Sequence, residues 1–330
     1  MNGHGRGRGR PTLEEVALRA GVGRGTASRV VNGSPGVSER ARAAVEAAVA
    51  ELGYVPDRAA RALAADRAGA VALVLPEPQS PLLTEPCFAG VLRGAAEALA
   101  GAGVELVLAL GGGAPALSGH RVDGVLLPAS GAVEPPPGIP AVVGGRGSGA
   151  GTLPSVDCDH LGGAAEAVRH LLGRGRRTIA AIAGPPGDEG AGRRLEGYRR
   201  ALAAAGHPPD ERLVAVGGPG EDGGRRAMRE LLERRPALDA VFAASDLLAA
   251  GARRELRAAG RRVPQDVALV GFGDSALARH LDPPLTSVRP PAEELGRTMA
   301  RLLLARISGG GSREREEIVL PAELIVRGST

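Results

Sequence analysis

From about residue 69 onward, short apolar runs alternate with segments of helical length. Strands buried on both faces of a sheet are apolar throughout, whereas the helices that cover them are amphipathic, so this alternation predicts parallel sheets with helices on both faces. About 260 residues of this pattern suffice for two α/β lobes with a ligand cleft between them. The apolar runs lie at 70–76, 104–110, 122–128, 141–145, 177–185, 213–218, 240–245 and 266–274, and the helical segments at 88–101, 162–172, 193–205, 223–234 and 247–259.

The stretch from Thr12 to Asn32 has a different pattern and predicts two short helices joined by a tight turn. Apolar residues recur at helical spacing in each half, Gly21 ends the first helix, and Val22 can fill the angle between the two. This arrangement is typical of a helix-turn-helix, whose second helix enters the major groove of DNA. The residues alone leave a second interpretation open, an ordinary helical hairpin packed in a larger core.

Charge is concentrated at the same end of the chain. Residues 1–67 contain 11 Arg and 7 acidic residues, whereas the other 263 residues carry equal numbers of basic and acidic side chains. A basic domain is attracted to phosphate, because neutralising phosphates releases counterions. The Gly-rich segment 1–11 is expected to be a disordered basic tail, since it can bury nothing to offset the entropy lost on ordering.

Local signals place the other elements of this first domain. Thr12 and Glu15 have the spacing of a capping box, and Ser38 and Gly53 bound a third helix. Pro56 and Asp57 can start a short helix that runs from Arg58 to about residue 65. Gly23 stands where Ser or Thr would cap the second helix, and Gly25 lies inside that helix, where glycine costs about 1 kcal/mol relative to alanine.

The sequence from residue 12 to 64 resembles the DNA-binding headpiece and hinge of the LacI/GalR family of bacterial transcription regulators. The similarity rests on the motifs AGV, SRVVNG, VSE, ELGY and YxPxxxARxLA, and later on RLEGYRRALAAAG, LDPPLTSVR and PAELIVRGST. It implies an all-α helix-turn-helix headpiece at 12–55, a hinge helix and linker at 56–68, and a two-lobed, periplasmic-binding-protein-like α/β domain with parallel sheets at 69–330.

The resemblance also implies DNA-binding residues. Arg24 and Gly25 match the family's base-reading pair, and Arg29 matches an Arg that reaches a guanine or its phosphate. Arg suits bidentate contact with guanine, whereas Gly25 cannot read a base edge. Leu63 matches the hinge residue that wedges into the minor groove at the operator centre, and packing within the hinge pair is compatible with that role. Backbone-contacting or supporting roles fall to Thr12, Thr26, Ser28, Asn32 and Tyr54.

Four residues are candidates for binding an effector. Arg194, in RxxGY, matches the family's effector-binding Arg, and Asp246 follows an apolar strand, where the loops of α/β domains gather around ligands. Asp159 follows the SVDCD strand, and Phe88 begins a helix. Each has a structural alternative: Arg194 could pair with a surface carboxylate, and Asp159 or Asp246 could simply cap a helix.

Several departures from the family pattern bear on the effector. Ser245, Gly273 and Pro290 stand where Asn, Asp and Gln are usual, so each removes hydrogen-bonding capacity from the expected pocket. The segment 111–120 is also too short for the family's helix between two strands, so it is expected to be stretched or the local pairing altered. These losses leave open a regulator whose cleft is degenerate.

The remaining features of the sequence limit the classes of function that the protein can have. Two cysteines and six scattered histidines give no metal-ligand spacing, and no nucleophile elbow is present, so neither enzyme activity nor a cofactor or metal is expected. No apolar run has the length of a membrane span and the first twenty residues lack a secretory signal, which favours the cytoplasm. We expect a repressor that binds a palindromic operator as a homodimer, modulated by a small polar effector such as a sugar or sugar derivative. The rival is a small-molecule binding protein without DNA-regulatory activity.

Overall fold

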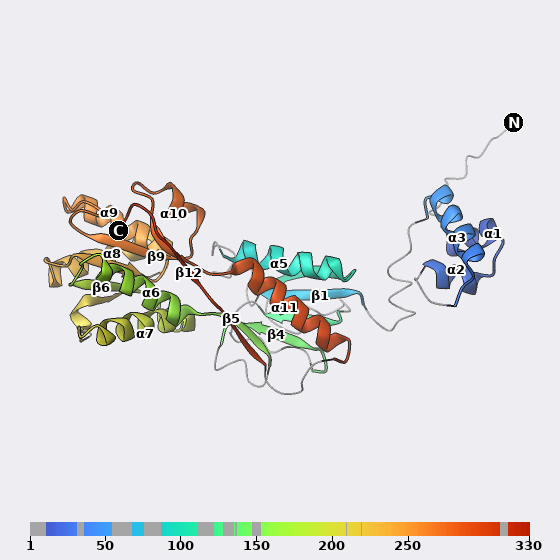
Figure 1. The fold of residues 1–330 in the computed structure, drawn as a ribbon, viewed down its shortest axis with the longest axis horizontal. Coiled ribbons are helices and arrows are strands. Elements are labelled where there is room, and N and C mark those ends of the chain that lie inside the picture. The colour runs from blue at the N-terminus through green and yellow to red at the C-terminus, as the bar shows by residue number, and fades with distance from the viewer. Residues whose placement is uncertain are drawn as a thin grey trace. The chain divides into compact units, whose positions relative to one another are not determined.

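A computed structural model describes residues 11–31, 36–54, 68–75, 87–110, 122–127, 135, 137–146, 153–208, 210–218, 220–310 and 316–330. The chain divides into two compact units, Met1–Gly69 and Ala70–Thr330 (Figure 1). The expected tail at 1–10 and most of the expected hinge at 56–67 lie outside the described residues.

The first unit contains three helices around one small core. The helices are α1 (Leu13–Ala20), α2 (Arg24–Val31) and α3 (Glu39–Leu52). The predicted capping box is confirmed, because the Thr12 hydroxyl accepts from the Glu15 amide and the Glu15 carboxylate accepts from the Thr12 amide. Gly21 ends α1 with φ 65°, a left-handed conformation that favours glycine. Inward-facing residues of all three helices form the core, namely Val16, Ala17, Ala27, Val30, Val45 and Ala48, with Val22 packed against it as predicted.

The second unit contains two six-stranded sheets, and most strand pairs in both are parallel, as the alternating pattern predicted. Sheet A has the order β11-β5-β4-β3-β1-β2, and sheet B has the order β12-β10-β9-β8-β6-β7. Only the β10–β12 pair is antiparallel among the pairings described. The strands of sheet A are β1 (Ala70–Leu75), β2 (Glu105–Leu110), β3 (Gly124–Leu127), β4 (Ala141–Gly144), β5 (Ser155–Cys158) and β11 (Glu317–Leu320); those of sheet B are β6 (Ile179–Ala183), β7 (Val214–Val216), β8 (Ala240–Ala243), β9 (Ala268–Phe272), β10 (Thr286–Arg289) and β12 (Glu323–Ile325).

Helices cover both faces of sheet B. Alternate residues of its strands pack against α6 and α7 on one face and against α8 and α9 on the other. Figure 1 shows these two pairs of helices on opposite sides of the sheet. Sheet A has α5 and α11 side by side on one face. The helices of this unit are α5 (Phe88–Gly101), α6 (His160–Gly173), α7 (Glu189–Ala204), α8 (Gly220–Arg234), α9 (Asp246–Ala258), α10 (Ala276–His280) and α11 (Ala292–Ile307), with a 3-10 turn, η4, at Glu211–Leu213.

The second face of sheet A differs from the first, and the short 111–120 connection joins β2 to β3 of this sheet. A buried cluster that includes Ala72, Val74, Val125 and Val143 lies on this face, and within the described part of the unit no helix packs on it. The strand pairing is nevertheless regular: β1 pairs in parallel with β2 on one side and β3 on the other. The alternative that the shortened connection alters the pairing is therefore wrong for these strands.

The chain crosses between the two sheets three times. It passes from β5 to α6, from β10 to α11, and from β11 to β12. Each sheet is consequently built from segments that are distant in the sequence. The segments that follow β5, β10 and β11 therefore belong to the junction where the two lobes meet. At the first crossing, His160 after β5 lies beside Phe272 at the carboxyl end of β9.

Candidate functional site

In the described part of the predicted headpiece, residues 12–31 and 36–54, α2 presents one exposed face. Ala27 and Val30 are buried in the core, whereas Arg24, Gly25 and Arg29 are exposed and Ser28 is partly exposed. These four positions form i, i+4 pairs and so lie on one side of the helix. The predicted base-reading residues therefore share the surface of α2 that is free to enter a groove.

Arg24 begins α2 and is anchored by a single ion pair to α1. Its Nε lies 2.8 Å from Oε1 of Glu14, and both side chains are largely exposed to solvent. Gly23 serves as the backbone cap, since its carbonyl accepts from the amides of Thr26 and Ala27. Gly23 therefore has no side chain to cap α2, but its carbonyl still accepts hydrogen bonds from the first turn of the helix.

The other predicted DNA-binding residues have different surroundings. The hydroxyl of Thr12 is used in the capping box, Thr26 is partly exposed, and Tyr54 packs against the headpiece core. Asn32 and Leu63 lie outside the described residues. For all of these residues, contact with DNA stays a prediction.

In the second unit, Arg194 belongs to α7, and its side chain lies against the carboxyl ends of β8 and β9. Its Nη1 donates to the carbonyl of Ala244 at 2.6 Å, and its guanidinium carbon lies 4.9 Å from the ring centre of Phe272. Its Nη2 is 3.5 Å from Oδ2 of Asp188, and only 14% of the side chain is exposed. Its Nε is buried and has no hydrogen-bond partner among the residues described. The structural alternative for Arg194, a pair with a surface carboxylate, is therefore present as well, because the Asp188 side chain is 43% exposed.

The two candidate aspartates play different structural parts. Asp159 is the N-cap of α6 and accepts from the Gly162 amide at 2.8 Å. It thus has the helix-capping role that was predicted as the structural alternative to binding an effector. Asp246 does not cap α9, because Ser245 does. Asp246 is 2% exposed, and its two oxygens accept from the Ser275 amide at 2.7 Å and from the Ser287 hydroxyl at 2.5 Å. Burial raises the pKa of Asp246 despite these hydrogen bonds, which lower it.

Phe88 lies at the first position of α5 and packs in the core of the first lobe with 8% of its surface exposed. For Phe88, Asp159, Arg194 and Asp246 alike, contact with an effector stays a prediction. Arg194 is the member of this set that presents a buried nitrogen with no partner among the described residues.

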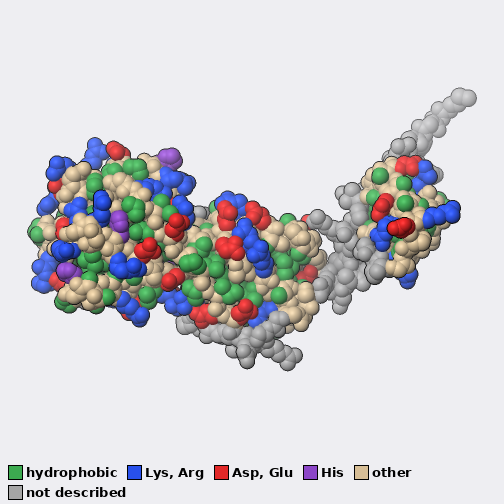
Figure 2. Space-filling view, viewed as in Figure 1, with side chains coloured by type: hydrophobic (Ala, Val, Ile, Leu, Met, Phe, Trp, Pro, Cys, Tyr) green, Lys and Arg blue, Asp and Glu red, His purple; other side chains and the backbone are tan. Residues whose placement is uncertain are grey.

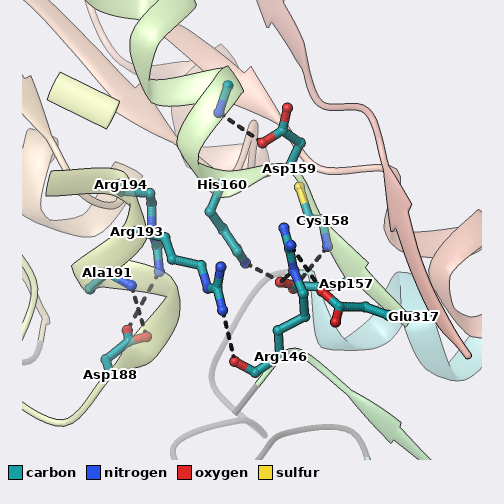
Figure 3. A network of polar contacts seen from close by, with 11 residues as sticks. Arg146, Asp157, Cys158, Asp159, His160, Asp188, Ala191, Arg193, Arg194 and Glu317 are labelled. Atoms are coloured by element: carbon teal, nitrogen blue, oxygen red, sulfur yellow. Dashed lines mark hydrogen bonds and ion pairs between the residues drawn. The ribbon is translucent and has the colours of Figure 1, made fainter. Parts of the chain in front are cut away.

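A network of charged residues joins the two lobes beside Arg194 (Figure 3). Arg146, which follows β4, donates from Nε to Asp157 at 3.2 Å and from Nη1 to Glu317 at 2.9 Å. From the other lobe, Nη2 of Arg193 donates to the Arg146 carbonyl at 3.0 Å. The network links β4, β5 and β11 of sheet A to α7 of the other lobe. Movement of one lobe relative to the other would therefore change these contacts.

His160 completes this network. Its Nε2 lies 3.4 Å from Oδ1 of Asp157, and its ring centre lies 5.5 Å from that of Phe272. Burial would raise the pKa of Asp157, but hydrogen bonds and charge from His160, with hydrogen bonds from Arg146 and the Cys158 amide, together hold that pKa below its usual value. Asp157 is therefore a buried carboxylate that stays ionised, beside the His160 ring and the Arg146 guanidinium.

Comparisons with known proteins agree with this architecture. The family model for bacterial regulatory proteins of the lacI family matches residues 12–57, and the model for a periplasmic binding protein-like domain matches residues 168–330. The HTH-type transcriptional regulator CelR of Thermobifida fusca is 50% identical over 339 aligned residues, which cover 98% of this chain and 99% of that relative. The chain belongs to the LacI family.

Other LacI-family members extend the comparison. The HTH-type transcriptional repressor CytR of Escherichia coli K12 is 32% identical, with 97% of this chain and 96% of CytR covered. A solved CelR–cellobiose complex is 48% identical, covers 97% of this chain and 100% of its own, and has a TM-score of 0.73. The Lac repressor dimer bound to operator and the anti-inducer ONPF is 26% identical, with 97% and 99% covered and a TM-score of 0.79.

As a member of the LacI family, the protein is a DNA-binding transcription regulator and not an enzyme. This finding excludes the alternative of a small-molecule binding protein without DNA-regulatory activity. In the described part of the chain, no helix is both long and apolar enough to cross a membrane. Figure 2 shows acidic and basic side chains interspersed on the visible face of the second unit, in line with its balanced charge.

Sequence reasoning missed several residues around Arg194. Phe272 is predicted only as part of the apolar run 266–274, and the sequence does not single out Arg146, Asp157, His160 or Arg193. Asp157 lies two residues before Asp159 in the same SVDCD motif, so a signal for an acidic residue was present. The sequence could not say which carboxylate faces the junction, because that depends on the pleat and on partners from β4 and β11.

Proposed function

We propose that the protein is a repressor that binds a palindromic operator as a homodimer and is released by a carbohydrate. The observation that carries the proposal is the exposed face of α2, on which Arg24, Ser28 and Arg29 lie together at the surface of a helix-turn-helix. A two-fold dimer reads a two-fold site, and the Lac repressor structure to which this chain is similar is a dimer on operator DNA. We assign residues 12–55 to the headpiece, 56–68 to the hinge and 69–330 to effector binding and dimerisation.

Within the proposed complex, Arg24 reads a guanine through its major-groove O6 and N7 atoms. Arg29 reaches a second guanine or its phosphate, and Thr26, Ser28 and Asn32 bind phosphates that fix the docking register. Thr12 and Tyr54 support the same surface. Leu63 of the proposed hinge wedges into the minor groove at the operator centre. Gly25 contributes no base contact, so the hinge and the two arginines supply most of the specificity.

We infer that the effector is a carbohydrate and take cellobiose as the first candidate, because the solved relative at 48% identity is a complex with cellobiose. Arg194 would donate to sugar hydroxyls. Arg194 and His160 both lie against the Phe272 ring, and His160 lies beside Asp157, so His160 and Asp157 would join the same site. Sugar binding would shift DNA affinity only if it favours one arrangement of the lobes, and the Arg146–Arg193 contact links the lobes beside this site.

A second proposal keeps the DNA-binding role without a sugar. Asp246 is engaged by Ser275 and Ser287, and Gly273 and Pro290 replace polar residues expected in the pocket, so fewer groups are free to bind hydroxyls. This alternative, a regulator whose cleft is degenerate, predicts operator binding that no sugar changes.

The DNA-reading role is tested by Arg24→Ala and Arg29→Ala. Binding sites are selected from random DNA with the wild-type chain, and fluorescence anisotropy then gives the affinity of each variant for the selected site and for a random duplex. We expect each variant to lose roughly 5- to 100-fold on the selected site, as for a lost bidentate contact, and much less on random DNA.

Arg19→Ala is the matched control for these two variants. Arg19 is also an exposed headpiece arginine, but it pairs with Glu51 of α3 rather than lying on the face of α2. An equal loss on selected and random DNA for Arg24→Ala and Arg29→Ala would show that they act only as phosphate-binding charges and would overturn the assignment.

A further inference from the structure

The base-reading candidate Arg24 has an acidic neighbour that the proposed function leaves unexplained. Glu14 lies in the first turn of α1, and its Oε1 is 2.8 Å from Nε of Arg24. The two side chains are 61% and 72% exposed, so this pair contributes little to folding. A carboxylate beside a DNA-reading arginine also repels phosphate. Its presence is therefore unfavourable for general DNA affinity and calls for another explanation.

The chemistry of the guanidinium group supplies an explanation for the presence of Glu14. Arginine has five N–H donors in a rigid planar fork, and bidentate contact with guanine needs two of them. Because the ion pair with Glu14 is made at Nε, the two terminal nitrogens of Arg24 stay available for guanine O6 and N7.

The surroundings of Arg24 make this contact more important. Gly23 and Gly25 flank it, and a Cβ built on either glycine would meet nothing within 4 Å. The two chain neighbours of Arg24 therefore have no side chain to pack on it, and with 72% of its side chain exposed the stem would otherwise sample many rotamers. Ordering such a side chain at the DNA surface costs conformational entropy, which a contact already formed in the free protein reduces.

We propose that Glu14 is a positioning residue for DNA recognition, which holds the Arg24 guanidinium ready for bidentate contact with a guanine. The proposal rests on the proposed function, in which Arg24 reads a base. It assigns Glu14 two opposite effects: its charge weakens binding to every DNA sequence, and its contact with Arg24 strengthens binding to the cognate site alone.

These two effects separate in the variant Glu14→Gln. Removing the charge should raise affinity for random DNA, whereas loosening Arg24 should lower the ratio of cognate to random affinity by roughly 3- to 10-fold, part of the discrimination that a bidentate pair provides. The measurement is fluorescence anisotropy of the full chain at one fixed salt concentration, on the selected site and on a scrambled duplex.

Glu51→Gln is the matched control. Glu51 is also an exposed headpiece glutamate paired with an arginine, Arg19, at 2.6 Å, but the pair joins α1 to α3. The control changes net charge by the same amount, so both affinities should rise together and their ratio should stay constant. An unchanged ratio in Glu14→Gln, or an equal drop in Glu51→Gln, would overturn the proposal.

The Arg24→Ala background distinguishes positioning from direct contact. If Glu14 acts through Arg24, adding Glu14→Gln to Arg24→Ala leaves the ratio where Arg24→Ala put it. A further drop in the double variant would mean that Glu14 itself accepts from a cytosine N4, and positioning would be wrong. If Arg24→Ala alone leaves the ratio unchanged, the base-reading role of Arg24 fails first, which separates the two failures.

Discussion

Asp246 is the buried carboxylate on which several segments of the second lobe converge. It accepts from the Ser275 amide before α10 and from the Ser287 hydroxyl in β10. Gly271 must be glycine here, because a Cβ at this position would lie 2.5 Å from Oδ1 of Asp246. The residue thus ties α9 to the loop after β9 and to β10, close to the Arg194 junction.

Replacing Asp246 by Ala should destabilise the second unit by about 2 kcal/mol or more, because two buried donors lose their acceptor. Urea unfolding of the full chain, followed by circular dichroism, measures the loss. Asp246→Asn is the matched control: its oxygen can still accept from Ser275 and its amide can donate to the Ser287 hydroxyl, so it should lose less. An equal loss in both variants would contradict this reading.

The same comparison has a defined pH dependence. Burial raises the pKa of Asp246 in the folded protein, so the folded state holds its proton more tightly than the unfolded chain does. The stabilising contribution of Asp246 is therefore greatest below its unfolded pKa of about 3.9 and decreases as pH rises through the raised folded pKa. The deficit of Asp246→Ala should shrink over that interval, and a deficit that grows would contradict the assigned direction.

Single residues were predictable from the sequence where their contacts are local. Thr12 with Glu15, Gly21, Ser38 and Gly53 were identified because capping depends on neighbours within a few positions. The carboxylates were not separable in the same way. Asp159 and Asp246 have similar positions after apolar strands, but the partners of Asp246 lie 29 and 41 residues away, and no local pattern indicates them.

At the scale of elements, the paired helices owe their close approach to glycine. In the α8–α9 pair, a Cβ on Gly251 would lie 1.9 Å from the carbonyl oxygen of Glu221. In the α5–α11 pair, a Cβ on Gly94 would lie 1.9 Å from the carbonyl oxygen of Glu293. The backbones of these helices therefore touch where a side chain would separate them.

Gly251→Ala should consequently destabilise the protein by about 1–3 kcal/mol, because the added methyl group forces α9 from α8. Gly192→Ala is the matched control, since Gly192 lies in α7 and a Cβ there meets nothing within 4 Å. The control should gain up to about 1 kcal/mol from the higher helix propensity of alanine. Thermal unfolding of the two variants tests this, and a Gly251→Ala protein as stable as the wild type would contradict the packing.

Helix and strand positions were largely predictable, and their starts less so. The spacing predicted a helix over 88–101, which is where α5 lies, but it started α7 at 193 instead of Glu189. The extra turn is explained by Asp188, whose side chain caps the helix so that it begins four residues before the predicted start. A polar first turn such as this one adds no apolar periodicity, so the pattern alone misses it.

At the scale of the whole molecule, the sequence predicted two parallel α/β lobes but not how they are assembled. The order of strands, the three crossings between sheets and the placement of β11 and β12 depend on long-range pairing, which repeated apolar runs do not specify. The network of Arg146, Asp157, Glu317 and Arg193 exists only because those crossings bring four segments together. Family resemblance located Arg194 but not its neighbours.

The central claim is that a carbohydrate bound at the Arg194 junction releases the protein from a specific operator. The measurement is the affinity of the full chain for its selected site with and without cellobiose, with glucose as a control sugar and with Arg194→Ala compared. We expect cellobiose to weaken wild-type binding by roughly tenfold, within the usual range of coupling between sites, and Arg194→Ala to bind the operator equally well but ignore the sugar. Wild-type affinity that cellobiose leaves unchanged, or an Arg194→Ala protein that responds as the wild type does, would contradict the account.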